Sequence, residues 1–285
     1  MKVLLIGANG QLGKTLRESV PKEIELVALD LPDIDITDLQ QVESTIAETR
    51  PDIIVNSAAY TAVDRAEEEP EVAIAVNAIG PKNLAMAAKH CGARLIHVST
   101  DYVFDGTAGT PYTPHTGCNP LGIYGKSKRQ GELNILDAMD NFVIIRTSWL
   151  YSKYGNNFVL TMLRLMRERE QLNIVADQIG GPTWTFSLAQ AIWKLSLKNN
   201  LSGIFHFSNA GVASWYDFAI AIQEEAVLLG RLKKWIPIDP IRTERYPTPA
   251  KRPLYTVLDC TRTWHDFDIS PIHWRVALRL MLKEL

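Results

Sequence analysis

The opening segment KVLLIGANGQLGKTL constrains the fold of this chain more than any other stretch. Residues 2–6 form a short apolar run typical of a buried strand, and Gly7, Gly10 and Gly13 follow before helical spacing begins. Glycines at such a turn let the backbone bend sharply and approach a pyrophosphate, which the N–H groups at the start of the next helix stabilise. The segment therefore predicts a strand, a phosphate-binding turn and a helix in succession.

An acidic residue follows the next strand-like run. Residues 25–29 are mostly apolar and Asp30 comes directly after them, 17 residues beyond Gly13. A carboxylate at this spacing accepts hydrogen bonds from a ribose 2′-OH and repels a 2′-phosphate, which favours NADH. Lys14 and Arg17 are close enough in sequence to bind a phosphate instead, so the preference between NADH and NADPH stays open.

Strand-like and helical segments alternate through the first half of the chain. The strands are expected at 2–6, 25–29, 52–56, 94–99 and 142–147, and the clearest connecting helices at 38–49 and 71–90. This alternation predicts βαβ units and a parallel sheet with helices on both faces. The expected fold class is therefore α/β, with a Rossmann-type doubly wound parallel sheet.

The pattern loosens after residue 150, where Pro and aromatic residues cluster in DQIGGPTW and RYPTPAKRPLYTVLDC. We expect residues 1–150 to form a dinucleotide-binding domain and residues 151–285 a smaller C-terminal substrate-binding lobe. Within the second half, 184–208 is a candidate to return to the sheet. The final stretch SPIHWRVALRLMLKEL has apolar residues at helical spacing and predicts a terminal helix.

Composition narrows the range of partners. A net charge of −2 and a hydrophobic content of 46% are typical of a globular protein and indicate no general affinity for nucleic acid or membrane. Cys91, Cys118 and Cys260 lack CxxC spacing, which argues against a disulfide framework or a zinc site. The first apolar run is too short for a secretion signal, and no segment approaches the roughly 18 apolar residues of a membrane span. We expect a cytoplasmic protein without a metal.

The stretch IYGKSKRQGE contains a pair suited to acid–base chemistry. Tyr124 and Lys128 are four residues apart, so on a helix their side chains lie on one face. A tyrosine, with an ordinary pKa near ~10, is a usable acid–base group near neutrality when a nearby positive charge stabilises its phenolate. Thr100 ends a predicted strand, where its hydroxyl would hold a substrate oxygen. The alternative is an exposed helix face whose Tyr and Lys are unrelated.

Four motifs together carry a resemblance to a known family. GANGQLG, NSAAYTAVD, VSTDYVFDG and YGKSK resemble the extended short-chain dehydrogenase/reductases. NSAAYTAVDRAEEEPE, STDYVFDGTAGTPY, RTSWLYSKYGNNFV and YPTPAKRP extend the resemblance to the dTDP-4-dehydrorhamnose reductase family, over nearly the whole chain. The resemblance implies reduction of the 4-keto group of a dTDP-linked 6-deoxyhexulose by NADPH or NADH, which gives dTDP-L-rhamnose.

The resemblance also implies roles for individual residues. Tyr124 would be the proton donor, Lys128 its activator and ribose ligand, and Thr100 the residue that orients the carbonyl. Asp101 and Trp149 fall on sugar-contacting positions, although Trp149 alone would be interpreted as a core aromatic. Positions that contact the cofactor in the family are occupied by Gly7, Gly10, Gln11, Leu12, Gly13, Asp30, Asp35, Ile36, Ala59, Tyr60 and Thr61. Asp35 has a second interpretation, as part of a helix N-cap, and Asn77 falls on a supporting position.

A diphosphate substrate requires local cations in a chain of net negative charge. Arg252 and Lys251, in the proline-bounded loop YPTPAKRPLY, are the candidates, with solvated loop charges as the alternative. Some family members are expected to dimerise around magnesium through an acid in the first helix. Thr15 stands at that position here, so we expect no interface metal and leave the choice between monomer and homodimer open.

Two alternatives to the reductase function remain at this stage. A nucleotide-sugar epimerase has the same fold and returns the hydride to its substrate. A regulatory β subunit of methionine adenosyltransferase also resembles these reductases and binds a dinucleotide without catalysis, since a fold does not fix a function. The combination of Thr100, Tyr124 and Lys128 favours catalysis.

Overall fold

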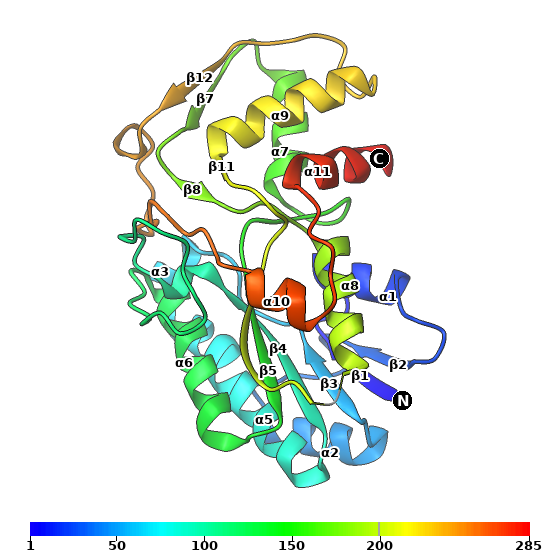
Figure 1. The fold of residues 1–285 in the computed structure, drawn as a ribbon. Coiled ribbons are helices and arrows are strands. Elements are labelled where there is room, and N and C mark those ends of the chain that lie inside the picture. Colours follow the sequence, from blue (N-terminus) through cyan, green and yellow to red (C-terminus); the bar gives the residue numbers. More distant parts are fainter. Residues whose placement is uncertain (199) are drawn as a thin grey trace.

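The computed structural model describes residues 1–198 and 200–285. Its centre is a six-stranded parallel sheet in the order β10-β5-β4-β3-β1-β2 (Figure 1). The strands are β1 (Lys2–Ile6), β2 (Glu25–Leu29), β3 (Ile53–Asn56), β4 (Arg94–Thr100), β5 (Phe142–Thr147) and β10 (Gly203–Phe207). The predicted Rossmann-type fold is confirmed, and the runs of buried Val, Ile and Leu reflect a sheet covered on both faces.

Helices cover the two faces of this sheet as separate layers (Figure 1). One layer comprises α2 (Leu39–Thr49), α5 (Gly80–Cys91) and α6 (Ile123–Ala138), and the other α1 (Gln11–Glu18), α8 (Thr185–Ser196) and α10 (Thr261–Asp266). Each layer has its own apolar core, built around Leu84 and Ile135 on the first face and around Leu16 and Ile192 on the second. Because α8 and β10 belong to this body, these two elements lie with the sheet although they follow part of the lobe in sequence.

The strand order reverses direction at β1. The chain passes from β1 to β2 on one side and then returns to place β3 on the other side of β1. Loops that leave the carboxyl ends of β1 and β3 therefore diverge, and such a point in an open parallel sheet forms a ligand-binding crevice. The turn at Gly7 and the loop that begins at Ser57 leave the sheet at this point.

The helix expected at 71–90 is helical throughout but contains a π-helical turn. The structure forms α3 (Arg65–Glu68), α4 (Pro70–Ile74), a π-helical turn at Ala75–Ile79 and then α5. A Cβ on Gly131 of α6 would lie 2.1 Å from the carbonyl oxygen of Asn77 in that turn, so α6 packs against its backbone. The prediction of a helix at 71–90 is confirmed, and only the widened π turn, which local apolar spacing does not indicate, was not predicted. Asp52, expected in β3, precedes it and accepts a hydrogen bond from Lys2 N–H at 2.7 Å.

The remaining elements form a lobe at the carboxyl edge of the sheet (Figure 1). Its core contains residues of α7 (Phe158–Glu168), α9 (Trp215–Leu228) and α11 (Trp274–Lys283). The short strands that join in pairs are β6 (Leu150–Tyr151) with β9 (Thr183–Trp184), β7 (Leu172–Val175) with β12 (Ile238–Ile241), and β8 (Ile179–Gly180) with β11 (Ala213–Ser214). Two 3-10 turns, Asp101–Val103 and Thr243–Arg245, complete the elements. The predicted terminal helix is α11. Among the described residues, no helix is long and apolar enough to span a membrane.

Candidate active site

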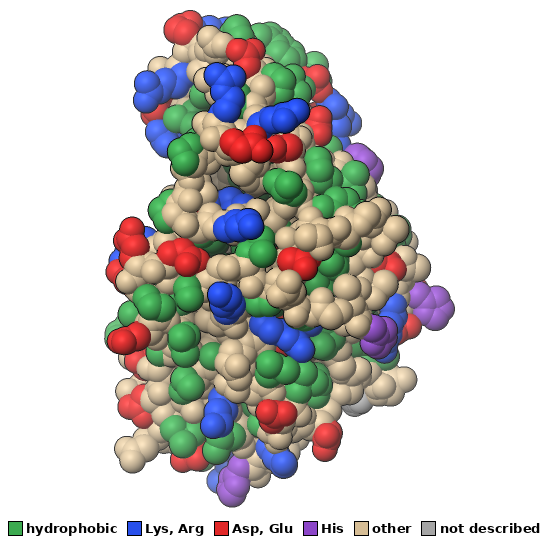
Figure 2. Space-filling model, turned by 90° about the vertical axis from the view of Figure 1, so that its left-hand side faces the viewer, with side chains coloured by type: hydrophobic (Ala, Val, Ile, Leu, Met, Phe, Trp, Pro, Cys, Tyr) green, Lys and Arg blue, Asp and Glu red, His purple; other side chains and the backbone are tan. Residues whose placement is uncertain are grey.

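A cavity of about 750 Å³ extends along the carboxyl ends of β1, β3, β4 and β5. The molecular surface is hollowed between the sheet body and the lobe, and Lys or Arg side chains lie beside the hollow (Figure 2). The predicted site residues that line the cavity are Gly7, Gly10, Gln11, Leu12, Asp30, Asp35, Ile36, Ala59, Thr61, Thr100, Asp101, Tyr124, Lys128 and Trp149. Gly13, Tyr60 and Arg252 do not line it. The structure therefore gathers residues from six separated parts of the chain into one site.

The glycine turn has no room for side chains where it meets its neighbours. Gly7 has a φ of +83°, and a Cβ there would lie 2.5 Å from Ala58 N. A Cβ on Gly13 would lie 2.1 Å from the carbonyl oxygen of Gly7, so Gly13 packs behind the turn. Gly10 precedes α1 and offers no side-chain cap, which leaves N–H groups of the first helical turn available to a ligand. This arrangement fits a dinucleotide pyrophosphate.

Asp30 is fixed beside this turn. Its two carboxylate oxygens accept hydrogen bonds from Asn9 N–H and Leu31 N–H, both at 2.8 Å. These bonds fix the carboxylate at the edge of the cavity and leave further lone pairs for hydroxyl groups of a ligand. Lys14 does not line the cavity; its Nζ lies 5.6 Å from the centre of the Tyr154 ring.

Asp35 and Ile36 line the far end of the cavity and serve the fold there as well. Asp35 accepts hydrogen bonds from Thr37 N–H and Thr37 Oγ1 at 2.9 and 2.8 Å, while Asp38 is the N-cap of α2. The stretch DIDITD is therefore a helix N-cap region, in which Asp38 is the N-cap residue and Asp35 precedes it by three positions. The Ile36 side chain packs against Gly80, where a Cβ would lie 2.5 Å from Ile36 Cδ1.

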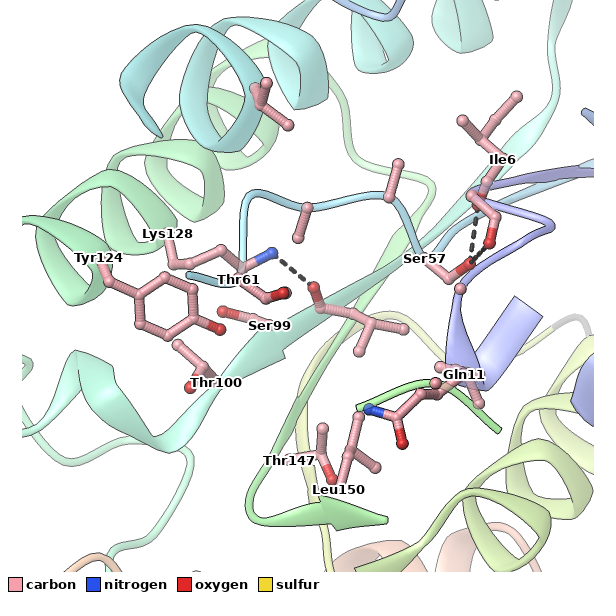
Figure 3. Close-up of a pocket in the computed structure, with 18 of the residues that line it drawn as sticks. Ile6, Gln11, Ser57, Thr61, Ser99, Thr100, Tyr124, Lys128, Thr147 and Leu150 are labelled. Atoms are coloured by element: carbon pink, nitrogen blue, oxygen red, sulfur yellow. Dashed lines mark hydrogen bonds between the residues drawn. The ribbon is translucent and has the colours of Figure 1, made fainter. Parts of the chain in front are cut away.

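Tyr124 and Lys128 project from α6 toward the end of β4, where Ser99 and Thr100 lie (Figure 3). Burial raises the pKa of the Tyr124 phenol to about 12, and the Thr100 hydroxyl opposes the shift. Burial also raises the pKa of Asp101 to about 6. Asp101 Oδ2 and Thr147 Oγ1 are buried and have no hydrogen-bond partner among the described residues. The cavity thus contains a protonated phenol and polar atoms suited to substrate hydroxyl groups.

Lys128 is buried, with 1% of its surface exposed. Its Nζ donates a hydrogen bond to Val98 O at 2.7 Å (Figure 3). The same Nζ lies 3.3 Å from His97 Nε2. Burial lowers the pKa of Lys128 to about 8, against the opposing effect of Glu132. His97 in turn lies 3.0 Å from Asn56 Nδ2 through its Nδ1. Sequence reasoning missed His97 and Asn56, although both lie in predicted strands.

A second buried network supports the same region. Glu132 Oε1 accepts hydrogen bonds from Ser99 Oγ at 2.6 Å and Arg146 Nε at 2.9 Å, and its Oε2 accepts from Arg146 Nη2 at 2.8 Å. Arg129 adds a further bond at 2.7 Å. The carboxylate is therefore fully occupied beneath Ser99, which holds α6 against β4 and β5. None of these residues was predicted, because the pairing depends on the packing of α6 on the sheet.

Asn77 fixes the backbone of the loop after β3 by hydrogen bonds to Tyr60. Asn77 accepts a hydrogen bond from Tyr60 N–H at 2.9 Å and donates to Tyr60 O at 3.0 Å and to Ser127 Oγ at 3.1 Å. The Tyr60 hydroxyl donates to Glu69 at 2.8 Å, away from the cavity. Tyr60 thus contributes its backbone to the position of Ala59 and Thr61, which line the cavity.

Trp149 joins the sheet to the lobe. Its ring stacks on Trp215 with a centroid distance of 3.5 Å, and a Cβ on Gly180 would lie 2.6 Å from it. Its φ of +47° is unusual for a residue with a side chain and costs on the order of 1–3 kcal/mol. Because it lines the cavity and also packs on the lobe core, both interpretations of Trp149 describe part of its environment.

Arg252 forms an ion pair with Asp64. Its guanidinium donates to both carboxylate oxygens of Asp64 at 2.9 and 2.7 Å, and Ala250 N–H donates to the same carboxylate at 3.2 Å. This bond to Arg252 lowers the pKa of Asp64. The pair links the lobe loop to the loop after β3. Lys251 is exposed.

Thr15 of α1 stands at the position where an acid was expected for a metal-bound dimer interface. Thr15 is buried, and its hydroxyl lies 2.9 Å from that of Thr185. Nearby, Lys153 Nζ forms ion pairs with Glu18 at 3.2 Å and Glu284 at 3.4 Å. Over residues 1–198 and 200–285, no three His, Cys, Asp or Glu side chains are grouped so that they could hold a metal ion.

Comparison with known proteins gives consistent results. The model of the RmlD substrate binding domain family matches residues 1–285. A dTDP-4-dehydrorhamnose reductase from Aggregatibacter actinomycetemcomitans is 43% identical over 285 residues, which cover 98% of this chain and 97% of that protein. The crystal structure of dTDP-4-dehydrorhamnose reductase from Bacillus anthracis in complex with NADP matches with a TM-score of 0.94 at 40% identity, covering 100% of this chain and 99% of the other. UDP-glucose 4-epimerase from Thermus thermophilus, in complex with NAD, shares the fold at 20% identity, with a TM-score of 0.83 and coverage of 99% and 98%.

Proposed function

The chain belongs to the dTDP-4-dehydrorhamnose reductase family, and we propose on this premise that it reduces the 4-keto group of dTDP-4-dehydrorhamnose to give dTDP-L-rhamnose. The observation that supports this proposal most is the gathering of Thr100, Tyr124 and Lys128 beside a glycine turn in one cavity. Full-length similarity to named reductases, one of them with NADP in its crystal structure, supports the same substrate and cofactor class.

NADPH or NADH, when bound, supplies the hydride that the carbonyl carbon receives. The turn at Gly7 and Gly10 and the start of α1 hold the pyrophosphate, and Asp30 holds the adenosine ribose. Asp35 and Ile36 border the adenine, while Ala59 and Thr61 border the rest of the cofactor. Dinucleotide binding is thus assigned to residues 1–150 together with α8 and β10, and substrate binding to the remaining lobe.

Tyr124 donates the proton that the carbonyl oxygen needs. Its raised pKa keeps the phenol protonated at neutral pH, which suits a donor in the reducing direction. Thr100 holds the carbonyl oxygen close to the phenol. Lys128 binds the nicotinamide ribose, and its ammonium form stabilises the phenolate that remains after the proton has left.

The sugar is placed against Asp101 and Trp149. The buried Oδ2 of Asp101, which has no partner within the described part of the chain, accepts a hydrogen bond from a sugar hydroxyl, and the Trp149 ring offers an apolar face. Arg252 is the candidate for the diphosphate and would exchange Asp64 for it. The partner is therefore a dTDP-linked 6-deoxy-4-keto-hexose, and the net charge of −2 favours no nucleic acid or membrane partner.

Three free cysteines are consistent with a reducing cytoplasm. The proposed reduction uses residues of one chain only, so it assigns no role in the reaction to a second subunit of a homodimer.

The test is an assay of purified protein with NADPH or NADH and dTDP-4-dehydrorhamnose. We expect one cofactor oxidised for each dTDP-L-rhamnose formed, measured by absorbance at the cofactor band and by chromatography of the sugar nucleotide. An epimerase would convert the sugar without net oxidation of added cofactor. Cofactor binding with no conversion of the sugar would support the regulatory alternative instead.

A further inference from the structure

The first turn of α6 has no cap in its own sequence. Gly122 is the N-cap residue and has no side chain, and no acid lies in the turn that follows it. The first N–H groups of a helix have no partner within the helix, so they need an acceptor from elsewhere. Tyr124, the proposed proton donor, is the second residue of this turn.

The acceptor is Glu67 of α3, which precedes Ile123 by 56 residues. Glu67 Oε1 accepts a hydrogen bond from Ile123 N–H at 2.8 Å, and α3 lies beside the start of α6 (Figure 1). A Cβ on Gly122 would lie 2.5 Å from the same oxygen, so the missing side chain at the N-cap leaves room for the carboxylate. A distant side chain therefore takes the place that Ser, Thr, Asp or Asn usually has at an N-cap.

Glu67 belongs to a segment that is itself fixed. Ala66, the preceding residue, is 0% exposed. Glu69 accepts a hydrogen bond from the Tyr60 hydroxyl at 2.8 Å, and Asp64 accepts one from Ala250 N–H at 3.2 Å. The segment is thus attached to the loop after β3 and to the lobe, so the Glu67 carboxylate is held in place at the start of α6.

The position of this first turn decides where the Tyr124 phenol lies. A Cβ on Gly125 would lie 2.2 Å from Tyr102 O, so the turn packs directly on the backbone that follows β4. Because Ile123 directly precedes Tyr124, a turn that loses its bond to Glu67 frays or shifts and takes the phenol with it. Misplacement of a reacting group by about 1 Å can cost ~10²-fold in rate.

We propose that Glu67 is a positioning residue that fixes the first turn of α6 and thereby aims the Tyr124 phenol at Thr100 and the substrate carbonyl. Glu67 does not line the cavity, so it acts through Tyr124 and not on the ligands. The role of Tyr124 as proton donor rests on the proposed function, whereas the position of its phenol can be measured independently of that function.

The first measurement needs no substrate. In full-length protein labelled with ¹³C at tyrosine Cζ, the Tyr124→Phe variant identifies the Tyr124 signal among the nine tyrosines. We expect Glu67→Ala to move this signal. Glu67→Gln keeps an acceptor oxygen for Ile123 N–H and loses only the charge that favours a helix N-terminus, so it should return the signal toward its wild-type position.

The matched control is Glu68→Ala, which removes the exposed neighbour on α3 and should leave the Tyr124 signal in place. An unmoved Tyr124 signal in folded Glu67→Ala protein would overturn the proposal, whatever the enzyme's substrate is. An equal movement in Glu68→Ala would also overturn it, because the effect would then come from α3 in general.

Steady-state kinetics test the consequence for the reaction. Glu67→Ala should reduce kcat by about tenfold and change the KM for the dTDP-sugar and the Kd for NADPH by less than about twofold. Glu67→Gln should recover most of kcat. If Glu67 only stabilised the helix, Glu67→Ala would lower Tm and leave the kcat of the folded protein unchanged, which would overturn the positioning role. A wild-type chain that reduces no sugar would instead overturn the proposed function, and the Tyr124 signal would still decide the role of Glu67.

Gly122→Ala breaks the same contact while Glu67 stays in the chain. The added Cβ takes the place of Glu67 Oε1 and displaces the carboxylate from Ile123 N–H. We expect a loss in kcat similar to that of Glu67→Ala, and a double variant within about twofold of either single variant, because both changes remove one contact. Losses that multiply would show two separate effects and would overturn the cap. If Glu67→Ala does not fold by circular dichroism, the Tyr124 signal in Gly122→Ala decides: a moved signal supports the proposal and an unmoved one overturns it.

Discussion

The two walls of the cavity are held in different ways. On the sheet wall, Lys128 is 1% exposed and is fixed by hydrogen bonds to β4, whose strand ends also place Thr100. On the lobe side, called the lobe wall here, Arg252 does not itself line the cavity. It is held by an ion pair to Asp64 in which the side chains are 22% and 40% exposed. A pair this exposed contributes about 1 kcal/mol or less. The sheet wall is therefore fixed by buried hydrogen bonds, whereas the exposed pair on the lobe wall would cost little to open, which the proposed exchange of Asp64 for a diphosphate requires.

The largest expected effect is on the sheet wall at the proton donor. Tyr124→Phe removes the phenol proton and should reduce kcat by ~10²-fold or more, while the Kd for NADPH stays nearly unchanged. The measurement is steady-state turnover together with cofactor titration by fluorescence. Tyr102→Phe is the matched control, since its ring packs edge-on against Tyr124 with centroids 5.5 Å apart, and it should cost much less. Turnover near the wild-type value in Tyr124→Phe would remove the donor assignment.

Lys128→Met should have the next largest effect. Because Lys128 is assigned both to the ribose and to the phenolate, we expect about a tenfold or greater loss in each of kcat and cofactor affinity. Lys126→Met, two residues away on the exposed face of α6, should change neither. A defect in kcat alone would mean that Lys128 does not contact the ribose.

Asp30 tests whether the sheet wall also selects the cofactor. Asp30→Ala should weaken NADH binding by about tenfold and NADPH binding less, because the lost carboxylate accepts from a 2′-OH but repels a 2′-phosphate. Asp33→Ala, exposed in the same loop, is the control. The Asp30 carboxylate also binds Asn9 N–H and Leu31 N–H, so an equal loss for both cofactors would assign it to the shape of the turn alone.

The smallest effect is expected on the lobe wall. Arg252→Ala should raise the KM for the dTDP-sugar by about three- to fivefold, a change on the order of 1 kcal/mol, with an unchanged Kd for NADPH. Lys251→Ala, an exposed neighbour, should leave the KM unaltered.

Asp64→Ala separates two explanations of that result. If Arg252 binds the diphosphate, releasing it from Asp64 should leave the KM equal or lower. If Arg252 serves only to hold the two loops together, Asp64→Ala should raise the KM as much as Arg252→Ala does, and the lobe wall would then be as fixed as the sheet wall.

The sequence by itself determined the sheet, the glycine turn and the family. Gly7 and Gly10 lie in one turn, Asp30 follows the next strand, and Tyr124 and Lys128 are one helical turn apart, so local spacing fixes their relative positions. Parallel strands bring their carboxyl ends to one edge of the sheet. Residues that follow different strands could therefore be assigned to one site from the sequence alone.

Only the tertiary structure decided the contacts that join distant segments. Arg252 and Asp64 are 188 residues apart, Asn56 and His97 are 41 residues apart, and Trp149, between β5 and β6, stacks on Trp215 of α9. No periodicity predicts such pairs, because they depend on how whole elements pack.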